Sequence, residues 1–158
     1  MRELGTEQSS VLQVRDLHVK VKTKNSTATI VQDINFELKR GRVLGLVGES
    51  GCGKTVTSMS ILQLLDRKTT TTEGSIVFQG RELNDLDDKE MRKIRGKDIA
   101  FIMQNPMNAF TPVFTIGHQF IETIRSHTPC NKKQATELAI EAMHHVNLPD
   151  PVKLLKYY

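Results

Sequence analysis

The sequence predicts an α/β fold, with antiparallel strands at its start and helices towards its end. Three observations lead to this fold class. The first third alternates apolar and polar residues, as half-buried strands do. A glycine-rich loop then joins a short apolar run to a helix-like segment, and the last third repeats apolar residues at helical spacing. With 158 residues, 38% of them hydrophobic, the chain has room for one ordinary domain with a core.

Composition argues against several functional classes. The net charge of +4 is spread over interleaved acids and bases, which is typical of a solvated surface and gives no reason to expect nucleic acid as a partner. The longest apolar runs fall far short of the ~20 residues that span a bilayer. Residues 1–10 lack the apolar core of a secretory signal. Cys52 and Cys130 show no metal or redox spacing, so we expect reduced thiols in a cytoplasmic protein.

Half-buried strands are predicted where apolar residues alternate with polar ones, and a polar turn is predicted over 22–29. The alternating sets are Leu12 and Val14, then Leu17, Val19 and Val21, and later Ile34, Phe36 and Leu38. The segment 69–72 is read as a loop, and 74–80 as a strand bounded by glycines. The runs 42–47 and 99–103 have little alternation, which predicts strands covered on both faces.

Helices are expected at three places. Apolar residues dominate 54–65 and charged ones 85–95. In the tail, Asn131 can cap a helix with Gln134 three residues on, and apolar residues then recur at helical spacing as far as Val146. Pro149 and Pro151 are expected to stop this helix.

One motif carries chemistry. The pattern G-x-x-x-x-G-K-[ST], a phosphate-binding loop, is matched by Gly48, Glu49, Ser50, Gly51, Cys52, Gly53, Lys54 and Thr55. Its glycines let backbone N–H groups converge on phosphate oxygens, and a helix starting near Lys54 points its positive end at the same anion. Lys54 is expected to reach the β- and γ-phosphates, and the Thr55 hydroxyl to ligate Mg²⁺. Val56 completes the predicted nucleotide-binding set.

The motif by itself does not choose among nucleotide enzymes, because kinases, GTPases and transport ATPases share it. A compact soluble kinase or GTPase is therefore an alternative. The guanine-reading tetrapeptide Asn-Lys-x-Asp does not occur, and residues 131–134 come nearest to it but lack the Asp.

Further segments resemble one family. Residues 48–55 look like the Walker A loop of ATP-binding-cassette (ABC) transporter ATPases, and 74–83 resemble the strand and turn that follow their first helix. Residues 95–106, ending in Met-Gln-Asn-Pro, resemble the Q-loop of the branch that imports dipeptides, oligopeptides and nickel, and 108–112 continue the likeness. The resemblance extends over 12–157, nearly the whole chain.

The resemblance implies an ATPase subunit, with ATP and Mg²⁺ as cofactors, peripheral to the cytoplasmic face of the membrane. Gln104 would be the Q-loop glutamine that contacts Mg²⁺ and the attacking water, so Lys54 and Gln104 form the expected catalytic pair. The segment 107–114, which runs from Met107 past Phe110 to Phe114, would dock a transmembrane permease subunit. A second ATP-binding subunit, identical or paralogous, would complete the dimer, and an extracytoplasmic solute-binding protein would act indirectly.

Departures from the family pattern shape the remaining expectations. No aromatic residue in 17–22 can stack on adenine, which leaves Val21 and Val31 for apolar contact. No Leu-Ser-Gly-Gly signature, no apolar strand ending in Asp-Glu and no switch histidine are found. We therefore expect a partial ABC domain that binds Mg-ATP without hydrolysing it alone. Residues 11–103 would form the β-subdomain and phosphate-loop core, and 104–158 the Q-loop and the start of the helical subdomain. Peptide and nickel or metal-chelate solutes both stay open, with a slight lean towards nickel.

Overall fold

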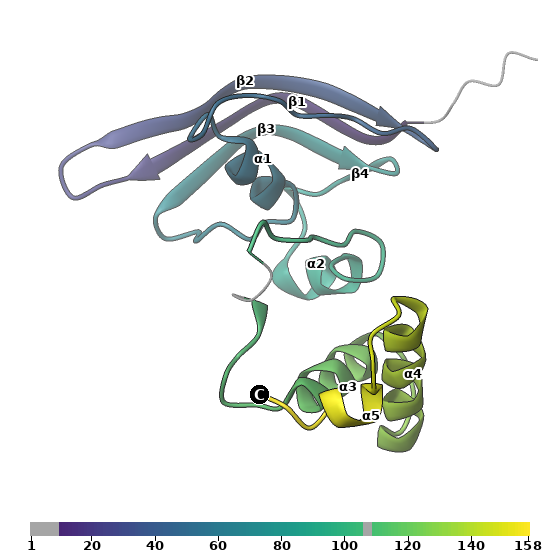
Figure 1. Ribbon diagram of the computed structural model, residues 1–158. Helices are drawn as coiled ribbons and strands as arrows, with labels where there is room; N and C mark the ends of the chain where they lie inside the picture. Colours follow the sequence, from purple (N-terminus) through teal and green to yellow (C-terminus); the bar gives the residue numbers. More distant parts are fainter. Residues whose placement is uncertain (1–9, 106–108) are drawn as a thin grey trace, which may run out of the picture. The chain divides into compact units, whose positions relative to one another are not determined.

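The computed structural model describes residues 10–105 and 109–158. The chain forms two compact units, Met1–Arg92 and Lys93–Tyr158. The first contains an antiparallel sheet with helix α1 (Lys54–Ile61), and the second is helical, as the ribbon shows (Figure 1). Helix α2 (Asp88–Ile94) spans the boundary between them. No helix in the described parts of the chain is both long and apolar enough to cross a membrane.

The sheet of the first unit has four strands in the order β2-β1-β3-β4, and every neighbouring pair is antiparallel. The strands are β1 (Ser10–Lys22), β2 (Thr27–Lys39), β3 (Thr70–Phe78) and β4 (Arg81–Glu82). The predicted half-buried strands and the strand predicted over 74–80 are thus confirmed. The turn between β1 and β2 is tighter than expected, with the Thr23 N–H donating to the Ser26 carbonyl at 2.8 Å.

A bulge explains why the first two alternating runs form one strand rather than two. Val14 and Leu17 are both buried although they are three residues apart, which a regular strand does not allow. Asp16 between them has φ of 49°, and the pairing of β1 with β2 shifts register there. The Asp16 N–H donates to Asn35 Oδ1 at 2.9 Å. The extra residue returns the following side chains to the buried face.

Strand β3 passes this bulge only because residue 74 is glycine. A Cβ on Gly74 would lie 2.3 Å from the Asp16 carbonyl oxygen and 2.6 Å from that of Arg15. The strand also starts earlier than expected, since Thr70 pairs with Val21 of β1. The prediction of a loop over 69–72 was therefore wrong from Thr70 onwards, because β-branched threonines fit a pleated, paired strand well.

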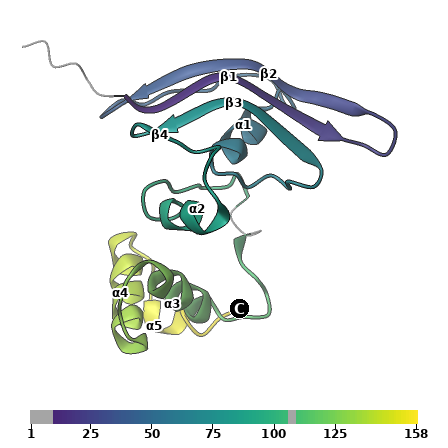
Figure 2. The ribbon, with the colours of Figure 1, turned by 180° about the vertical axis from the view of Figure 1, so that it is seen from behind.

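Helix α1 lies against one face of the sheet in both views (Figure 1 and Figure 2). It ends at Ile61, earlier than the expected 65, because Gln63 adopts φ of 50°, outside the helical region. The side-chain amide of Gln63 donates a hydrogen bond to the Leu83 carbonyl. The core of this unit includes Val14, Leu17, Val19, Val31, Leu62, Ile76 and Leu83.

The two strands expected to be covered on both faces are not formed, so this prediction was wrong. Residues 42–49 and 100–103 have no regular structure. Val43 is 98% exposed, Val47 97% and Ile102 89%. A strand of this kind needs hydrogen-bonded neighbours on both edges. Among the described residues, the named strands all belong to the one antiparallel sheet. The apolar segments 42–47 and 99–103 therefore pair with none of these strands.

The second unit is built from α3 (Ile116–His127), α4 (Lys132–His145) and α5 (Pro151–Leu154). Helix α4 confirms the predicted tail helix, including its cap: Asn131 Oδ1 accepts from the Gln134 N–H at 3.0 Å, and Gln134 Oε1 accepts from the Asn131 N–H at 3.0 Å. Pro149 follows this helix, but Pro151 opens α5 rather than only ending α4.

The other helices depart from expectation at their starts. The charged helix predicted over 85–95 is α2, which begins at Asp88 because Asp87 Oδ1 accepts from the Glu90 N–H at 2.8 Å. Helix α3 was not predicted. Its start is marked by Thr115, whose hydroxyl accepts from the His118 N–H. At the same end, the N–H groups of Ile116 and Gly117 donate to carbonyls of the segment after α5.

Candidate nucleotide-binding site

The candidate phosphate loop, residues 48–53, leads directly into helix α1. Gly53, the residue before the helix, has φ of 95°, a left-handed conformation that favours glycine. Within the described chain, no side chain caps this helix start. The first backbone N–H groups of a helix have no intrahelical partner, and together with the helix dipole they favour an anion at this point.

The loop is supported from behind by strand β2. Gly53 is buried, and a Cβ at this position would lie 3.0 Å from Val31 Cγ2 and 3.3 Å from the Ile30 carbonyl oxygen. Thr57, also buried, donates from both its N–H and its hydroxyl to the Gly53 carbonyl, at 2.8 and 3.0 Å. Thr57 was missed from the sequence, where a threonine four residues after the loop glycine is the only signal.

The Lys54 ammonium group lies among the residues of the loop. Its Nζ donates to the carbonyl oxygens of Gly48 and Glu49, both at 2.7 Å, and to Cys52 Sγ at 3.3 Å. An ammonium group has three donors, so the loop provides an acceptor for each of them. The positive charge is thereby held among the residues that the sequence predicts to surround phosphate.

The rest of the predicted nucleotide-binding set surrounds this lysine. Glu49, Ser50 and Cys52 are exposed, and so is Thr55 in the first turn of α1, while Val56 is half-buried. These positions follow from the continuity of the loop and helix. Of the two residues expected near adenine, Val31 is only 4% exposed because it packs behind Gly53, so only Val21 is accessible.

Gln104 lies in the second compact unit, whereas Thr55 lies in the first. Their shared role at Mg²⁺ stays a prediction. The donor chemistry fits, because a hydroxyl oxygen and an amide oxygen are hard ligands of the kind that Mg²⁺ accepts. In 10–105 and 109–158 no group of three or more His, Cys, Asp or Glu side chains could hold a metal ion.

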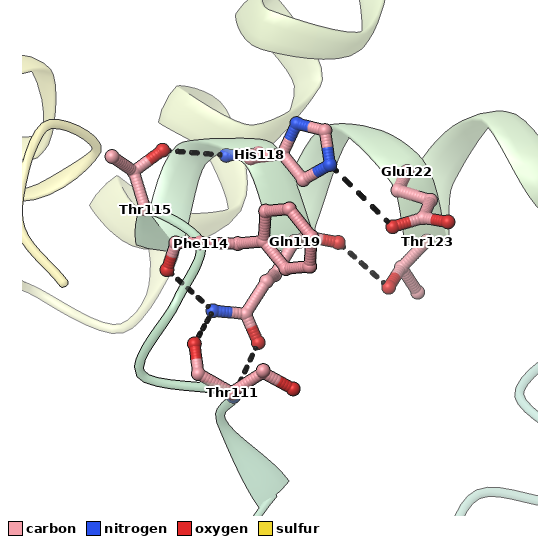
Figure 3. A network of polar contacts seen from close by, with 7 residues as sticks. All are labelled: Thr111, Phe114, Thr115, His118, Gln119, Glu122 and Thr123. Atoms are coloured by element: carbon pink, nitrogen blue, oxygen red, sulfur yellow. Dashed lines mark hydrogen bonds and ion pairs between the residues drawn. The ribbon is translucent and has the colours of Figure 1, made fainter.

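The predicted docking segment 107–114 is exposed where the structure describes it. Met107 lies outside the described residues. Val113 is 72% exposed, Phe114 47% and Phe110 39%. The same segment is also attached to helix α3, since the Gln119 side chain binds the backbone of Thr111 and Phe114, as Figure 3 shows.

The model of the ABC transporter family matches residues 31–156 of this chain. The chain belongs to the ABC transporter family. The match covers both the phosphate loop and the segment around Gln104, and it favours a transport ATPase over the compact kinase or GTPase. The resemblance inferred from the three sequence motifs is confirmed.

Curated relatives of this ABC chain include ATP-binding proteins of bacterial transport systems. It is 41% identical over 149 residues to the probable peptide ABC transporter ATP-binding protein y4tR of Sinorhizobium fredii, and 43% identical over 149 residues to the dipeptide transport ATP-binding protein DppD of Bacillus subtilis. Each alignment covers 94% of this chain and 44% of the relative. The metal-staphylopine import system ATP-binding protein CntD of Staphylococcus aureus is 40% identical over 82% of this chain and 47% of its own length. The chain therefore spans less than half the length of these relatives.

Two solved structures of ABC cassettes have the same fold. The dimeric, post-hydrolysis cassette MJ0796 bound to ADP and Pi superposes with a TM-score of 0.75 at 20% identity, covering 92% of this chain and 60% of the other. A second dimeric structure of MJ0796, a bacterial ABC transporter cassette, gives 0.76 at 22% identity over the same shares. The predicted α/β cassette fold is confirmed by this likeness.

Proposed function

We propose that residues 48–56 bind the phosphates of ATP, and that the chain serves as part of the ATP-binding subunit of an ABC importer. The observation that carries this proposal is the position of Lys54. Its ammonium lies within a glycine loop, 2.7 Å from two loop carbonyls, directly before a helix start without a side-chain cap. A fixed cation beside free backbone N–H groups is suited to a polyphosphate.

Each residue of the loop has a distinct task in this proposal. The backbone N–H groups of 48–53 and of the first turn of α1 donate to phosphate oxygens. Lys54 exchanges loop carbonyls for phosphate oxygens as the anion enters, and the Thr55 hydroxyl would contribute an oxygen ligand to Mg²⁺. Val21 offers apolar contact without aromatic stacking, so the phosphates provide most of the affinity.

ATP hydrolysis is proposed for the whole protein, in which bound Mg-ATP supplies a phosphoanhydride bond whose cleavage releases the free energy for transport. Lys54 stabilises charge on the transferred phosphoryl group, and Gln104 orients the attacking water. Residues 1–158 by themselves bind the nucleotide without hydrolysing it. Their sequence contains no Leu-Ser-Gly-Gly signature and no apolar strand that ends in Asp-Glu.

The proposed process is import of a peptide or of a nickel or metal chelate. Support comes from the relatives, whose names describe a peptide ABC transporter, dipeptide transport and metal-staphylopine import. We place the subunit at the cytoplasmic face of the membrane, where 107–114 docks a transmembrane permease subunit. A second ATP-binding subunit completes a dimer, as in the dimeric cassettes of the same fold. An extracytoplasmic solute-binding protein takes part indirectly.

Calorimetry with Mg-ATP tests the nucleotide site. Lys54→Ala is expected to weaken binding by at least about tenfold, because it removes a charge-assisted contact with phosphate. Lys24→Ala is the matched control. This exposed lysine lies in the turn between β1 and β2, so its substitution removes the same positive charge outside the phosphate loop. Equal affinity of Lys54→Ala and the wild-type chain would contradict the proposed site.

A further inference from the structure

Three successive residues of helix α3 hold the segment before it. The ring of His118 stacks on Phe114 with 4.8 Å between centroids, and Phe120 stacks on Phe110 at 6.5 Å. Gln119, between them, binds the backbone of the same segment. Successive residues of a helix point about 100° apart. The chain from 110 to 114 therefore wraps around the first turns of α3 and is held on three sides.

The Gln119 contact is the polar centre of this arrangement (Figure 3). Its Oε1 accepts from the Thr111 N–H at 2.8 Å, and its Nε2 donates to the Thr111 carbonyl at 3.0 Å. Nε2 also donates to the Phe114 carbonyl at 2.9 Å. One side chain thus satisfies three backbone groups of a single turn, which is closed further by the Phe114 N–H donating to the Thr111 carbonyl at 3.2 Å.

Only a side-chain amide can make this set of contacts, since it carries an acceptor oxygen and two N–H donors in one plane. A glutamate of the same length would lose both donated hydrogen bonds, and the two carbonyl oxygens would repel its carboxylate away from the Thr111 N–H. A methionine of similar size would offer neither an acceptor oxygen nor an N–H donor. The residue type at position 119 therefore fixes the shape of the turn, while the two ring stacks fix its ends.

We infer that Gln119 is a positioning residue for the docking surface: it sets the turn Thr111 to Phe114 so that Val113 and Phe114 face outwards towards the membrane subunit. Val113, at 72% exposed, is the residue that this turn presents most openly. We call the three hydrogen bonds of Gln119 with Thr111 and Phe114 the clamp. The partner in this inference rests on the function proposed above, whereas the clamp rests only on contacts of α3 with the turn that precedes it.

Amide exchange in residues 1–158, measured by NMR, tests the clamp. Gln119→Glu and Gln119→Met are each expected to speed exchange of the Thr111 N–H about fivefold or more, as for the loss of one net hydrogen bond. The matched control is Thr123→Val on the same helix. The Thr123 hydroxyl donates to the Gln119 carbonyl at 2.8 Å, so this change removes a bond of the same network without touching the turn. Thr111 exchange in the control should equal that of the wild-type chain.

A pH series separates the clamp from a general loosening of the helix. Below the ordinary glutamate pKa of about 4.3, the carboxyl introduced by Gln119→Glu becomes an acid with one donor and one acceptor. The ratio of its Thr111 exchange rate to that of the wild-type chain should then fall towards one. The same ratio for Gln119→Met should not change with pH, because a thioether has no proton to gain.

The outcomes distinguish the clamp from the docking role. Unchanged Thr111 exchange in Gln119→Glu would overturn the inference and leave the nucleotide site unaffected. The docking role is read in the full-length protein, as co-purification with its membrane subunits, where Gln119→Glu is expected to reduce assembly at least about threefold and Thr123→Val to have no effect. Faster exchange with normal assembly would overturn the docking role of this surface.

Discussion

The Lys54 ammonium lies 2.7 Å from the Gly48 carbonyl oxygen, so the first and seventh residues of the phosphate-loop motif are in direct contact. This hydrogen bond closes the loop before any nucleotide enters. Because Glu49 and Cys52 provide the other two acceptors, the lysine is held inside the loop instead of extending into solvent. An anion that enters competes with backbone carbonyls, and its charge gives it the advantage.

Binding without turnover is the first prediction for residues 1–158. Lys54 and the loop can hold Mg-ATP, but the positioned groups that orient water and close the site are not found in the sequence. Loss of one positioned group costs a factor of ~10² or more in rate. Phosphate release with Mg-ATP should therefore equal that of the Lys54→Ala variant. Turnover clearly above this control would reveal a catalytic group that has not been identified.

If the turn from Thr111 to Phe114 docks the membrane subunit, Val113→Asp should reduce solute uptake without affecting nucleotide binding. Val113 is 72% exposed, so the substitution should leave folding and nucleotide affinity unchanged. An unpaired carboxylate buried at an interface is costly, so solute uptake by the assembled importer should fall at least about tenfold. Val152→Asp on α5, where the valine is 54% exposed, provides the same change outside the segment. Normal uptake in Val113→Asp would move the docking surface elsewhere.

The contact of β3 with the β1 bulge predicts that two glycine substitutions lower the free energy of unfolding by unequal amounts. Gly74 and Gly80 both have positive φ, at 99° and 82°, so alanine has a comparable backbone cost at each. Only at Gly74 would the new Cβ meet backbone, 2.3 Å from the Asp16 carbonyl oxygen. In urea unfolding, Gly74→Ala should lower the free energy of unfolding by about 1–3 kcal/mol more than Gly80→Ala does. Equal costs would mean that the bulge moves freely.

The turn from β3 to β4 predicts loss of stability in acid. Burial raises the pKa of the Glu82 carboxyl, but hydrogen bonds from the Ser75 hydroxyl and from backbone N–H groups, including those of Ile76 and Asn84, lower it below its ordinary value. A carboxyl with a lowered folded-state pKa stabilises the fold above its unfolded pKa of about 4.3, and this stabilisation is lost as the pH falls through the folded value.

We therefore expect Glu82→Gln to lower the melting temperature at pH 7 by about 2–4 °C. The gap from the wild-type chain should narrow as the pH falls below about 4. Ser75→Ala removes one donor to the same carboxylate and should shift the melting temperature in the same direction by less. Thermal unfolding followed by circular dichroism at several pH values measures both variants. A gap that stays constant between pH 7 and pH 3 would show that the charge of Glu82 does not stabilise this turn.

The sequence alone determined the features that depend on neighbouring residues. Alternating residues such as Val19 and Val21 predicted strands, because the side chains of a strand point to alternate faces. The glycine loop ending in Lys54 was found from its spacing, because each of its residues serves one phosphate site. Asn131 and Gln134 predicted the start of α4, because a capping box is complete within four residues. These signals are local, so no other part of the chain was needed to interpret them.

Only the tertiary structure decided the features that depend on distant partners. The apolar run containing Val43 and Val47 reads as a strand, but it forms none in the described chain because pairing requires a neighbouring strand. The bulge at Asp16 became apparent only in the pairing of β1 with β2, and the close approach of Gly74 to it only in the folded sheet. Gln119 carries no motif; its role arises because the turn from Thr111 to Phe114 folds back onto α3 and leaves three backbone groups that one amide satisfies. Contacts across a turn depend on where the chain returns in space, which residue spacing does not encode.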